Sequence, residues 1–228
     1  MSEPRQLPLT FEHPPSHAVE DFLVADCNCE AVRWLDRWPN WPSPALVVHG
    51  RGGCGKTHLA QIFACRTGAL LVSHQELARD ALVQSAVLSA CSAACIVDDA
   101  DQAVAAGLEE PLLHLHNSLA EQHRRLLLTA ETPAVRWPMA LADLRSRLLA
   151  SASVGIGAPD DALMAGLLVK LFADRQLRVD DEVILYALPR IERSFDAARR
   201  LVADLDAATV DRRPSISVVR KLLRPQSE

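Results

Sequence analysis

The chain has 228 residues and a formal net charge of −5, with 49% hydrophobic and 23% charged side chains. This composition is that of a globular protein with a substantial core, and it excludes a disordered or collagen-like chain. The acidic balance argues against nucleic-acid binding through a broad basic face. Neither a signal peptide nor an apolar run of membrane-spanning length is visible, so we expect a cytoplasmic protein without membrane contact.

The first half of the chain alternates short apolar runs with helical patterns. Residues 1–17 are proline-rich and lack an amphipathic period, which predicts an extended tail, and residues 21–38 show helical spacing. Five apolar runs follow at 45–48, 69–72, 95–97, 126–128 and 153–156, with helical patterns at 57–67, 109–122 and 141–150. Buried-type strands separated by helices predict an α/β fold with a five-stranded parallel sheet flanked by helices.

After residue 157 the pattern is helical only. Amphipathic helices are expected at 160–175, 180–188, 194–208 and 215–223, with no strand among them. We therefore predict three parts: a tail over residues 1–17, an α/β core over 18–157, and a small all-helical subdomain over 158–228.

The first apolar run leads into a glycine-rich segment that fits the phosphate-loop pattern G-x-x-x-x-G-K-[ST] completely: Gly50-Arg51-Gly52-Gly53-Cys54-Gly55-Lys56-Thr57. Glycines allow consecutive backbone N–H groups to surround an anion, and the following helix adds its partial positive charge. We expect Lys56 to reach the β- and γ-phosphates and Thr57 to ligate Mg²⁺. A glycine-rich turn with a chance lysine is disfavoured by the strand before it and the helix after it. The prediction is an ADP or ATP site with Mg²⁺.

An acidic pair, Asp98 and Asp99, directly follows the apolar run at 95–97. Asp98 is predicted to hold Mg²⁺ together with Thr57, and Asp99 to orient or deprotonate the attacking water. The alternative is that the pair is an ordinary helix cap.

Three segments together resemble the AAA+ ATPases of the DnaA group: Gly55-Lys56-Thr57-His58-Leu59, Asp98-Asp99 and residues 127–133. The resemblance implies an AAA+ P-loop module with a helical lid, and it places His58 at the nucleotide. It also implies a sensor role for Glu131, where the group usually has Asp, and an Arg-finger role for Arg147.

The resemblance is less complete in the last part of the chain. The position where the group has a nucleotide-sensing arginine in the lid holds Asp196 in this chain. We therefore expect Arg193 or, one turn on, Arg199 to replace it at the nucleotide.

Within this group the chain is most similar to the Hda-type regulatory inactivators of DnaA. No basic recognition helix follows the lid, so we expect no direct sequence-specific DNA binding. The tail segment Gln6-Leu7-Pro8-Leu9-Thr10-Phe11 resembles the peptide that bacterial replication proteins insert into the sliding clamp, the β subunit of DNA polymerase III. The expected anchors are Gln6, Leu7, Leu9 and Phe11, because a stiff extended segment loses little entropy on docking.

The resemblance implies a regulator that, with the DNA-loaded clamp, stimulates hydrolysis of DnaA-bound ATP through Arg147. Two alternatives stay open: a self-sufficient P-loop ATPase or remodeller, and an adaptor that recruits DnaA without hydrolysis. The sequence also leaves open whether ADP or ATP is the active ligand, whether the chain hydrolyses ATP itself, and whether it forms homo-oligomers.

Overall fold

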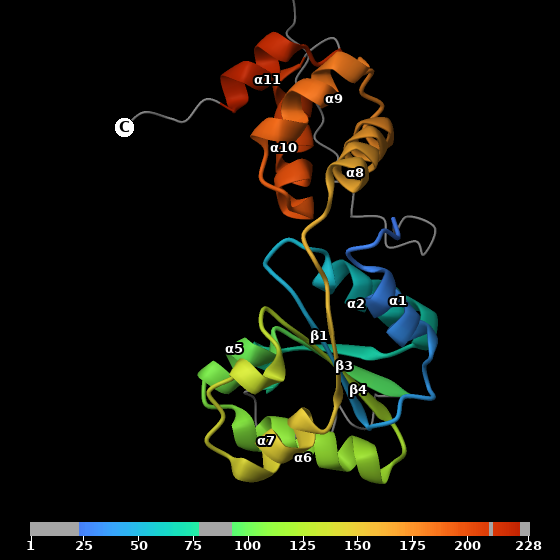
Figure 1. Cartoon of the computed structure of the whole chain (residues 1–228), viewed down its shortest axis with the longest axis vertical. Coiled ribbons are helices and arrows are strands. Elements are labelled where there is room, and N and C mark those ends of the chain that lie inside the picture. Colours follow the sequence, from blue (N-terminus) through green and yellow to red (C-terminus); the bar gives the residue numbers. More distant parts are fainter. Residues whose placement is uncertain (1–22, 78–92, 210–211, 224–228) are drawn as a thin grey trace, which may run out of the picture.

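The structure, a computed structural model, describes residues 23–77, 93–209 and 212–223. A sheet with helices on both faces forms one body, and a group of helices coloured orange to red forms a second body beside it (Figure 1). This arrangement confirms the predicted α/β class with a parallel sheet and a following helical part. No helix in the described ranges is both long and apolar enough to cross a bilayer.

The five expected apolar runs all form strands of one sheet. Their order is β2-β3-β4-β1-β5, and every neighbouring pair is parallel. The strands are β1 (Ala45–His49), β2 (Leu70–Ser73), β3 (Ala94–Asp98), β4 (Arg125–Ala130) and β5 (Ala152–Gly155). The three central strands β3, β4 and β1 are almost fully buried, which explains their continuous apolar sequences.

Helices connect the strands and cover both faces of the sheet. They are α1 (Cys29–Asp36), α2 (Lys56–Thr67), α3 (His74–Leu77), α5 (Ala100–Ala105), α6 (Glu109–Glu121), α7 (Ala142–Leu149) and a short 3-10 helix (Ala134–Arg136). The helical patterns at 57–67, 109–122 and 141–150 correspond to α2, α6 and α7. The sequence did not predict α3 and α5, because four and six residues are too few to show a helical period.

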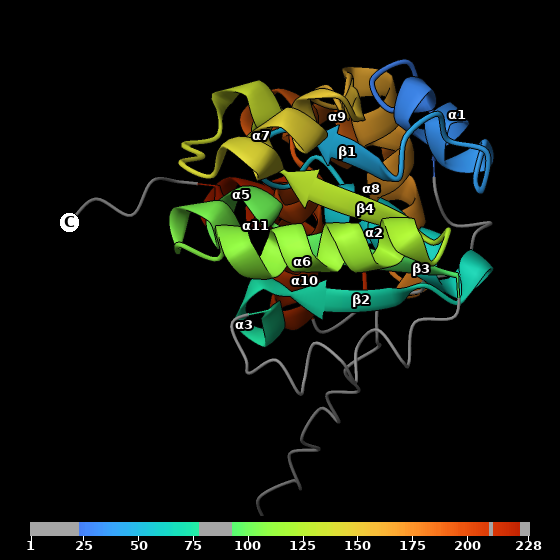
Figure 2. The same ribbon diagram turned by 90° about the horizontal axis from the view of Figure 1, so that it is seen from below.

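Alternate residues of each strand point into two separate hydrophobic cores. Ala45 and Val47 of β1 pack with side chains of α5, α6 and α7, whereas Leu46 and Val48 pack with side chains of α1 and α2. Figure 1 shows these two groups of helices on opposite faces of the sheet, and Figure 2 shows α6 lying across the sheet face that it covers. Helix α2, which follows the glycine-rich loop, and helix α5, which follows the acidic pair, are therefore held on opposite faces of the sheet.

The first helix is shorter than the pattern at residues 21–38 predicted. It begins at Cys29, because the side chain of Asn28 closes the chain before it into a turn. The Asn28 Oδ1 atom accepts a hydrogen bond from the backbone N–H of Ala25 at 2.9 Å, and its Nδ2 atom donates to the carbonyl oxygen of Leu23 at 2.9 Å. Such side-chain bonds to the backbone compete with helix formation.

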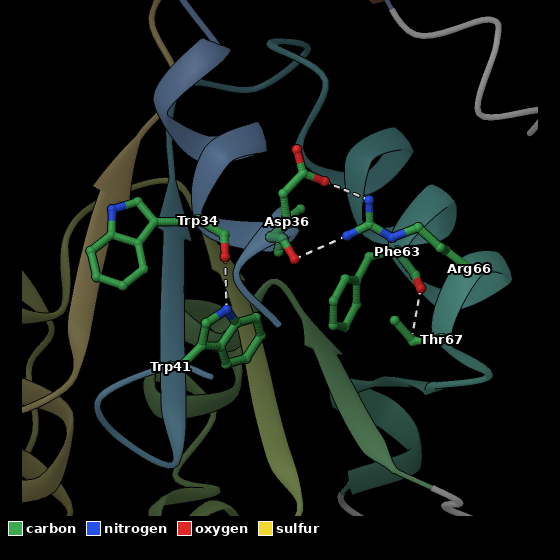
Figure 3. A network of polar contacts seen from close by, with 7 residues as sticks. Trp34, Asp36, Trp41, Phe63, Arg66 and Thr67 are labelled. Atoms are coloured by element: carbon green, nitrogen blue, oxygen red, sulfur yellow. Dashed lines mark hydrogen bonds and ion pairs between the residues drawn. The ribbon is translucent and has the colours of Figure 1, made fainter. Parts of the chain in front are cut away.

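Contacts between α1 and α2 fix the far end of the helix that follows the glycine-rich loop (Figure 3). Arg66 on the last turn of α2 pairs with Asp36 at 2.5 Å and donates to the main-chain carbonyl oxygen of Leu35 at 3.0 Å. The ring of Trp41 stacks on Phe63 of α2 with centroids 5.7 Å apart, and its Nε1 atom donates to the carbonyl oxygen of Trp34 at 2.8 Å. Aromatic packing and a half-exposed ion pair thus hold α2 against α1.

The helices after β5 form a subdomain that we call the lid. They are α8 (Asp161–Asp174), α9 (Asp181–Ala187), a short 3-10 helix (Leu188–Arg190), α10 (Phe195–Ala208) and α11 (Ile216–Leu222). The lid has its own hydrophobic core, against which the linker residues Leu23, Ala25 and Cys27 also pack. All four helices expected after residue 157 are present. The part boundaries at residues 17 and 157 stay predictions.

Candidate nucleotide-binding site

The glycine-rich loop joins the carboxyl end of β1 to α2 and faces the lid (Figure 1). Ligands of open parallel sheets bind at this edge, beyond the carboxyl ends of the strands. At the start of the loop, the backbone N–H of Gly50 donates to the carbonyl oxygen of Ala130 at 3.0 Å. A Cβ atom on Gly50 would lie 2.5 Å from the carbonyl oxygen of Ile156, so only glycine fits this position. The loop is therefore fixed to the sheet at its first residue.

Lys56, the first residue of α2, is buried, with an exposed fraction of 6%. Its Nζ atom donates to the carbonyl oxygen of Gly50 at 2.7 Å and to that of Arg51 at 3.1 Å. A buried ammonium group needs such acceptors. Because both are neutral carbonyl oxygens, they leave the positive charge of Lys56 available to an anion within the loop. His58, the other residue that the resemblance placed at the nucleotide, lies half-buried on the first turn of α2.

The ends of β3 and β4 bring Asp98 next to Thr129. The parallel register pairs Val97 with Leu128, so the residues that follow them are neighbours. The buried Thr129 hydroxyl donates to the Oδ1 atom of Asp98 and accepts a hydrogen bond from the backbone N–H of Asp99 at 3.0 Å. The Thr57 hydroxyl donates to the other carboxylate oxygen of Asp98 at 3.0 Å. The predicted pair Thr57 and Asp98 is thus in direct contact.

Thr129 was not among the predicted site residues. A hydroxyl side chain at the end of an otherwise apolar buried strand is the sequence signal that could have identified it, because such a group needs a partner.

Asp99 occupies the turn between β3 and α5 with left-handed backbone angles, φ 53° and ψ 50°. Burial raises the pKa of its carboxyl group, and the neighbouring Asp98 carboxylate raises it further, whereas Lys56 acts in the opposite direction. A carboxylate with a raised pKa holds a proton more readily, which suits a group that must accept one from water. Asp99 occupies the N-cap position of α5, but its side chain makes no capping hydrogen bond there.

Glu131 follows β4 and lies against the loop. A Cβ atom on Gly52 would be 3.3 Å from its Oε1 atom. The backbone N–H of Glu131 donates to the Oδ2 atom of Asp101 at 2.9 Å, so α5 positions the segment that carries Glu131. Asp101 was not among the predicted site residues either.

The oxygen atoms of Thr57 and Asp98 are of the kind that Mg²⁺ prefers. Within the ranges that the structure describes, no group of three or more His, Cys, Asp or Glu side chains is arranged to hold a metal ion by itself. A Mg²⁺ ion here would therefore take most of its ligands from phosphate and water, as is usual for this ion in phosphate sites.

The lid touches the loop at the beginning of α10. The backbone N–H of Phe195 donates to the carbonyl oxygen of Gly53 at 2.7 Å, and the Phe195 ring lies 3.5 Å from where a Cβ atom on Gly55 would be. Ser194 caps α10 by accepting a hydrogen bond from the backbone N–H of Ala197 at 3.1 Å. The lid and the loop are thus in direct contact.

Both expected lid arginines are paired with acidic residues of the lid. Arg193 lies 2.9 Å from Asp161 on α8, and Arg199 lies 3.9 Å from Asp196 on α10. The charged residue that the structure places against the loop from this segment is Asp196, whose Oδ2 atom would be 3.3 Å from a Cβ atom on Gly53.

Arg147 lies away from this cluster, on α7. Figure 1 shows α7 on the face of the sheet opposite to α2. Its guanidinium group pairs with Asp143 through contacts of 3.1 and 3.3 Å, and the two side chains are 41% and 52% exposed. The expected clamp anchors Gln6, Leu7, Leu9 and Phe11 lie outside the described residues.

Comparison with solved structures identifies the fold. Domain III of the replication initiation protein DnaA from Thermotoga maritima matches with a TM-score of 0.79 and 14% identity, over 93% of this chain and 99% of that domain. AMPPCP-bound DnaA from Aquifex aeolicus matches with a TM-score of 0.71 and 17% identity, over 92% of this chain and 69% of that one. The RuvB Holliday junction branch migration motor from Thermotoga maritima matches with a TM-score of 0.68 and 16% identity, over 90% and 70%. No protein-family model matches the chain.

The chain has a DnaA-like AAA+ fold. This confirms the predicted module at the level of fold. At 14–17% identity the similarity carries no residue role or activity with it.

The raised pKa of Asp99 predicts how stability depends on pH. The folded state binds the Asp99 proton more tightly than the unfolded state does. The contribution of Asp99 to the free energy of unfolding therefore becomes less favourable as pH rises above the ordinary aspartate pKa, about 3.9. Asp99→Asn should raise the melting temperature near pH 7, with a gain that shrinks as the pH falls towards that value. Calorimetry over this pH range measures the difference, and Asp101→Asn serves as the control. A gain independent of pH would instead reflect the tolerance of asparagine for left-handed backbone angles.

Proposed function

We propose that this chain is a nucleotide-binding AAA+ protein that acts in replication initiation and binds ADP or ATP with Mg²⁺. The observation that carries the proposal is the loop at residues 50–57, which holds the buried Lys56 ammonium group and places Thr57 on Asp98. A buried cation beside a glycine-rich turn and a helix N-terminus favours a polyphosphate ligand.

The residues around the loop would have different roles in binding such a ligand and in its hydrolysis. Backbone N–H groups of the loop and the Lys56 ammonium group would bind the phosphates, and Thr57 with Asp98 would hold Mg²⁺. The bound ion would supply neutralisation of phosphate charge. Thr129 fixes Asp98 and the backbone of Asp99, and Asp99 would accept a proton from an attacking water.

The more specific part of the proposal is regulation of the initiator DnaA. The chain would stimulate hydrolysis of DnaA-bound ATP while tethered to the DNA-loaded sliding clamp, as its similarity to Hda-type inactivators implies. Two features support this idea: the fold matches that of DnaA domain III, and Arg147 is exposed on a face remote from the chain's own loop. An arginine in such a position can act on the nucleotide of a neighbouring subunit.

A second candidate function is ATP hydrolysis by the chain itself. The raised pKa of Asp99 and its backbone contact with Thr129 favour it, since these features suit a catalytic base. Single-turnover assays with the isolated chain separate this activity from stimulation of DnaA.

The nucleotide site predicts that binding depends on Lys56. Lys56→Ala should weaken ADP and ATP binding about 10- to 100-fold, because hydrogen bonds to charged groups are worth about 1.5–3 kcal/mol. Isothermal titration calorimetry measures both affinities, with Lys221→Ala on α11 as a control that removes an exposed lysine. Unchanged affinities in a folded Lys56→Ala protein would contradict the assignment of the site.

The tail segment predicts that clamp binding depends on a few apolar anchors. Replacing Leu9 and Phe11 by Ala should weaken binding about 30-fold or more, since the loss of even one hot-spot anchor costs about 2 kcal/mol or more. Surface plasmon resonance on immobilised clamp measures the effect, and Thr10→Ala, between the anchors, is the matched control. If the double variant binds clamp like the parent, the tail does not carry the interaction.

The regulatory proposal predicts that Arg147 acts in trans. Arg147→Ala should keep nucleotide and clamp binding but reduce hydrolysis of DnaA-bound ATP by about 10³–10⁵, the range measured for arginine fingers. The assay is single-turnover hydrolysis of labelled ATP on DnaA with DNA-loaded clamp. Arg145→Ala, an exposed arginine on the same helix, is the control. Full activity of Arg147→Ala would favour the adaptor alternative, in which the chain recruits DnaA without supplying a catalytic group.

A further inference from the structure

The contact between lid and loop brings a carboxylate to the phosphate-binding turn. Gly53 has a left-handed backbone with φ +71°, and a Cβ atom on it would lie 2.8 Å from Cβ of Ser194 and 3.3 Å from Oδ2 of Asp196. The buried Ser194 fixes this approach by capping α10, and the hydrogen bond from Phe195 to Gly53 holds it in register. The Asp196 side chain is thus presented to the loop by a rigid helix terminus.

The Asp196 carboxylate acts electrostatically on Cys54, a residue inside the loop. Burial is the largest cause of the raised pKa of the Cys54 thiol, Lys56 lowers that pKa, and the Asp196 carboxylate raises it. The nearest cation to Asp196 on its own helix is Arg199, at 3.9 Å with its side chain 39% exposed, so solvent screens this pair and leaves part of the negative charge uncompensated.

A fixed negative charge at a phosphate site acts differently on ligands of different charge. A nucleoside triphosphate carries about one more negative charge than the diphosphate at neutral pH, with or without one bound Mg²⁺. Coulomb repulsion scales with the product of the charges, so the same carboxylate disfavours the triphosphate more. An interaction of this kind weakens as salt concentration rises.

We propose that Asp196 is a specificity-determining residue, which makes the site prefer nucleoside diphosphate to triphosphate through charge repulsion delivered by the lid. This inference rests on the proposed nucleotide site. It adds to that proposal the lid residue that sets the ligand preference.

The test compares the affinities of the full chain for ADP and for the non-hydrolysable triphosphate AMPPCP, with Mg²⁺, by titration calorimetry. The parent should bind ADP more tightly, and Asp196→Asn should reduce the ratio of the two affinities about three- to tenfold, a range that allows for screening by salt. Asp196→Glu should keep the ratio.

Arg199→Ala should increase the ratio, because Arg199 no longer compensates part of the negative charge of Asp196. Asp204→Asn, an exposed acid further along α10, is the matched control and should leave the ratio unchanged.

The salt dependence separates charge repulsion from a change in packing. Raising the salt concentration should lower the parent's preference for ADP, and should have a much smaller effect on Asp196→Asn. An unchanged ratio in Asp196→Asn would overturn the proposal while leaving the nucleotide site intact. Loss of triphosphate binding in Arg199→Ala would also overturn it, because Arg199 would then itself contact the phosphates. If the parent binds neither nucleotide, the proposed function fails, and this inference fails with it.

Discussion

The Asp98 carboxylate is the point on which the geometry of the site depends. One oxygen accepts a hydrogen bond from Thr57 on α2, and the other accepts one from Thr129 on β4. These two bonds join the helix after the loop to the ends of two strands, and Thr129 then fixes the backbone of Asp99. Because each hydroxyl can rotate to suit its acceptor, both carboxylate oxygens are hydrogen-bonded, and oxygen atoms of the kind that Mg²⁺ prefers are gathered at one point.

This cluster can form only because the sheet is parallel and its register is fixed. The carboxyl ends of β1, β3 and β4 meet at one edge, so residues separated by many positions in sequence become neighbours there. The central strands are buried on both faces, and a shift of register by one residue would move apolar side chains out of both cores. The packing of α1 and α2 on one face and of α5, α6 and α7 on the other therefore also determines where the acidic pair lies.

Much of the fold could be predicted from the sequence, and the site only in part. Five apolar runs and eight helical patterns predicted the strands and the longer helices, because burial on both faces and an amphipathic period leave a local signal. The turn at Asn28, which delays the start of α1, depends on side-chain bonds to Leu23 and Ala25 that apolar spacing does not reveal. Lys56, Thr57 and Asp98 were predictable because their motifs are local.

The roles of Thr129, Asp101 and Asp196 depend instead on contacts between segments distant in sequence. Thr129 meets Asp98 across the sheet, Asp101 accepts a hydrogen bond from the segment after β4, and Asp196 reaches Gly53 through the placement of the lid. Such contacts have no local sequence period. A hydroxyl at the end of an apolar strand marks Thr129 as a group that needs a partner, but only the assembled fold shows which residue that partner is.

The charges around the loop and on α7 suggest two separate surfaces with different tasks. At the loop, Glu131 lies against Gly52 and Asp196 against Gly53, and the buried Lys56 ammonium group carries the opposite charge. On the opposite face, Arg147 is exposed and held by Asp143 on the same helix, an arrangement that costs little to rearrange because exposed ion pairs are weak. The loop and Arg147 are thus held by helices on opposite faces of the sheet, so a substitution at one leaves the packing around the other unchanged.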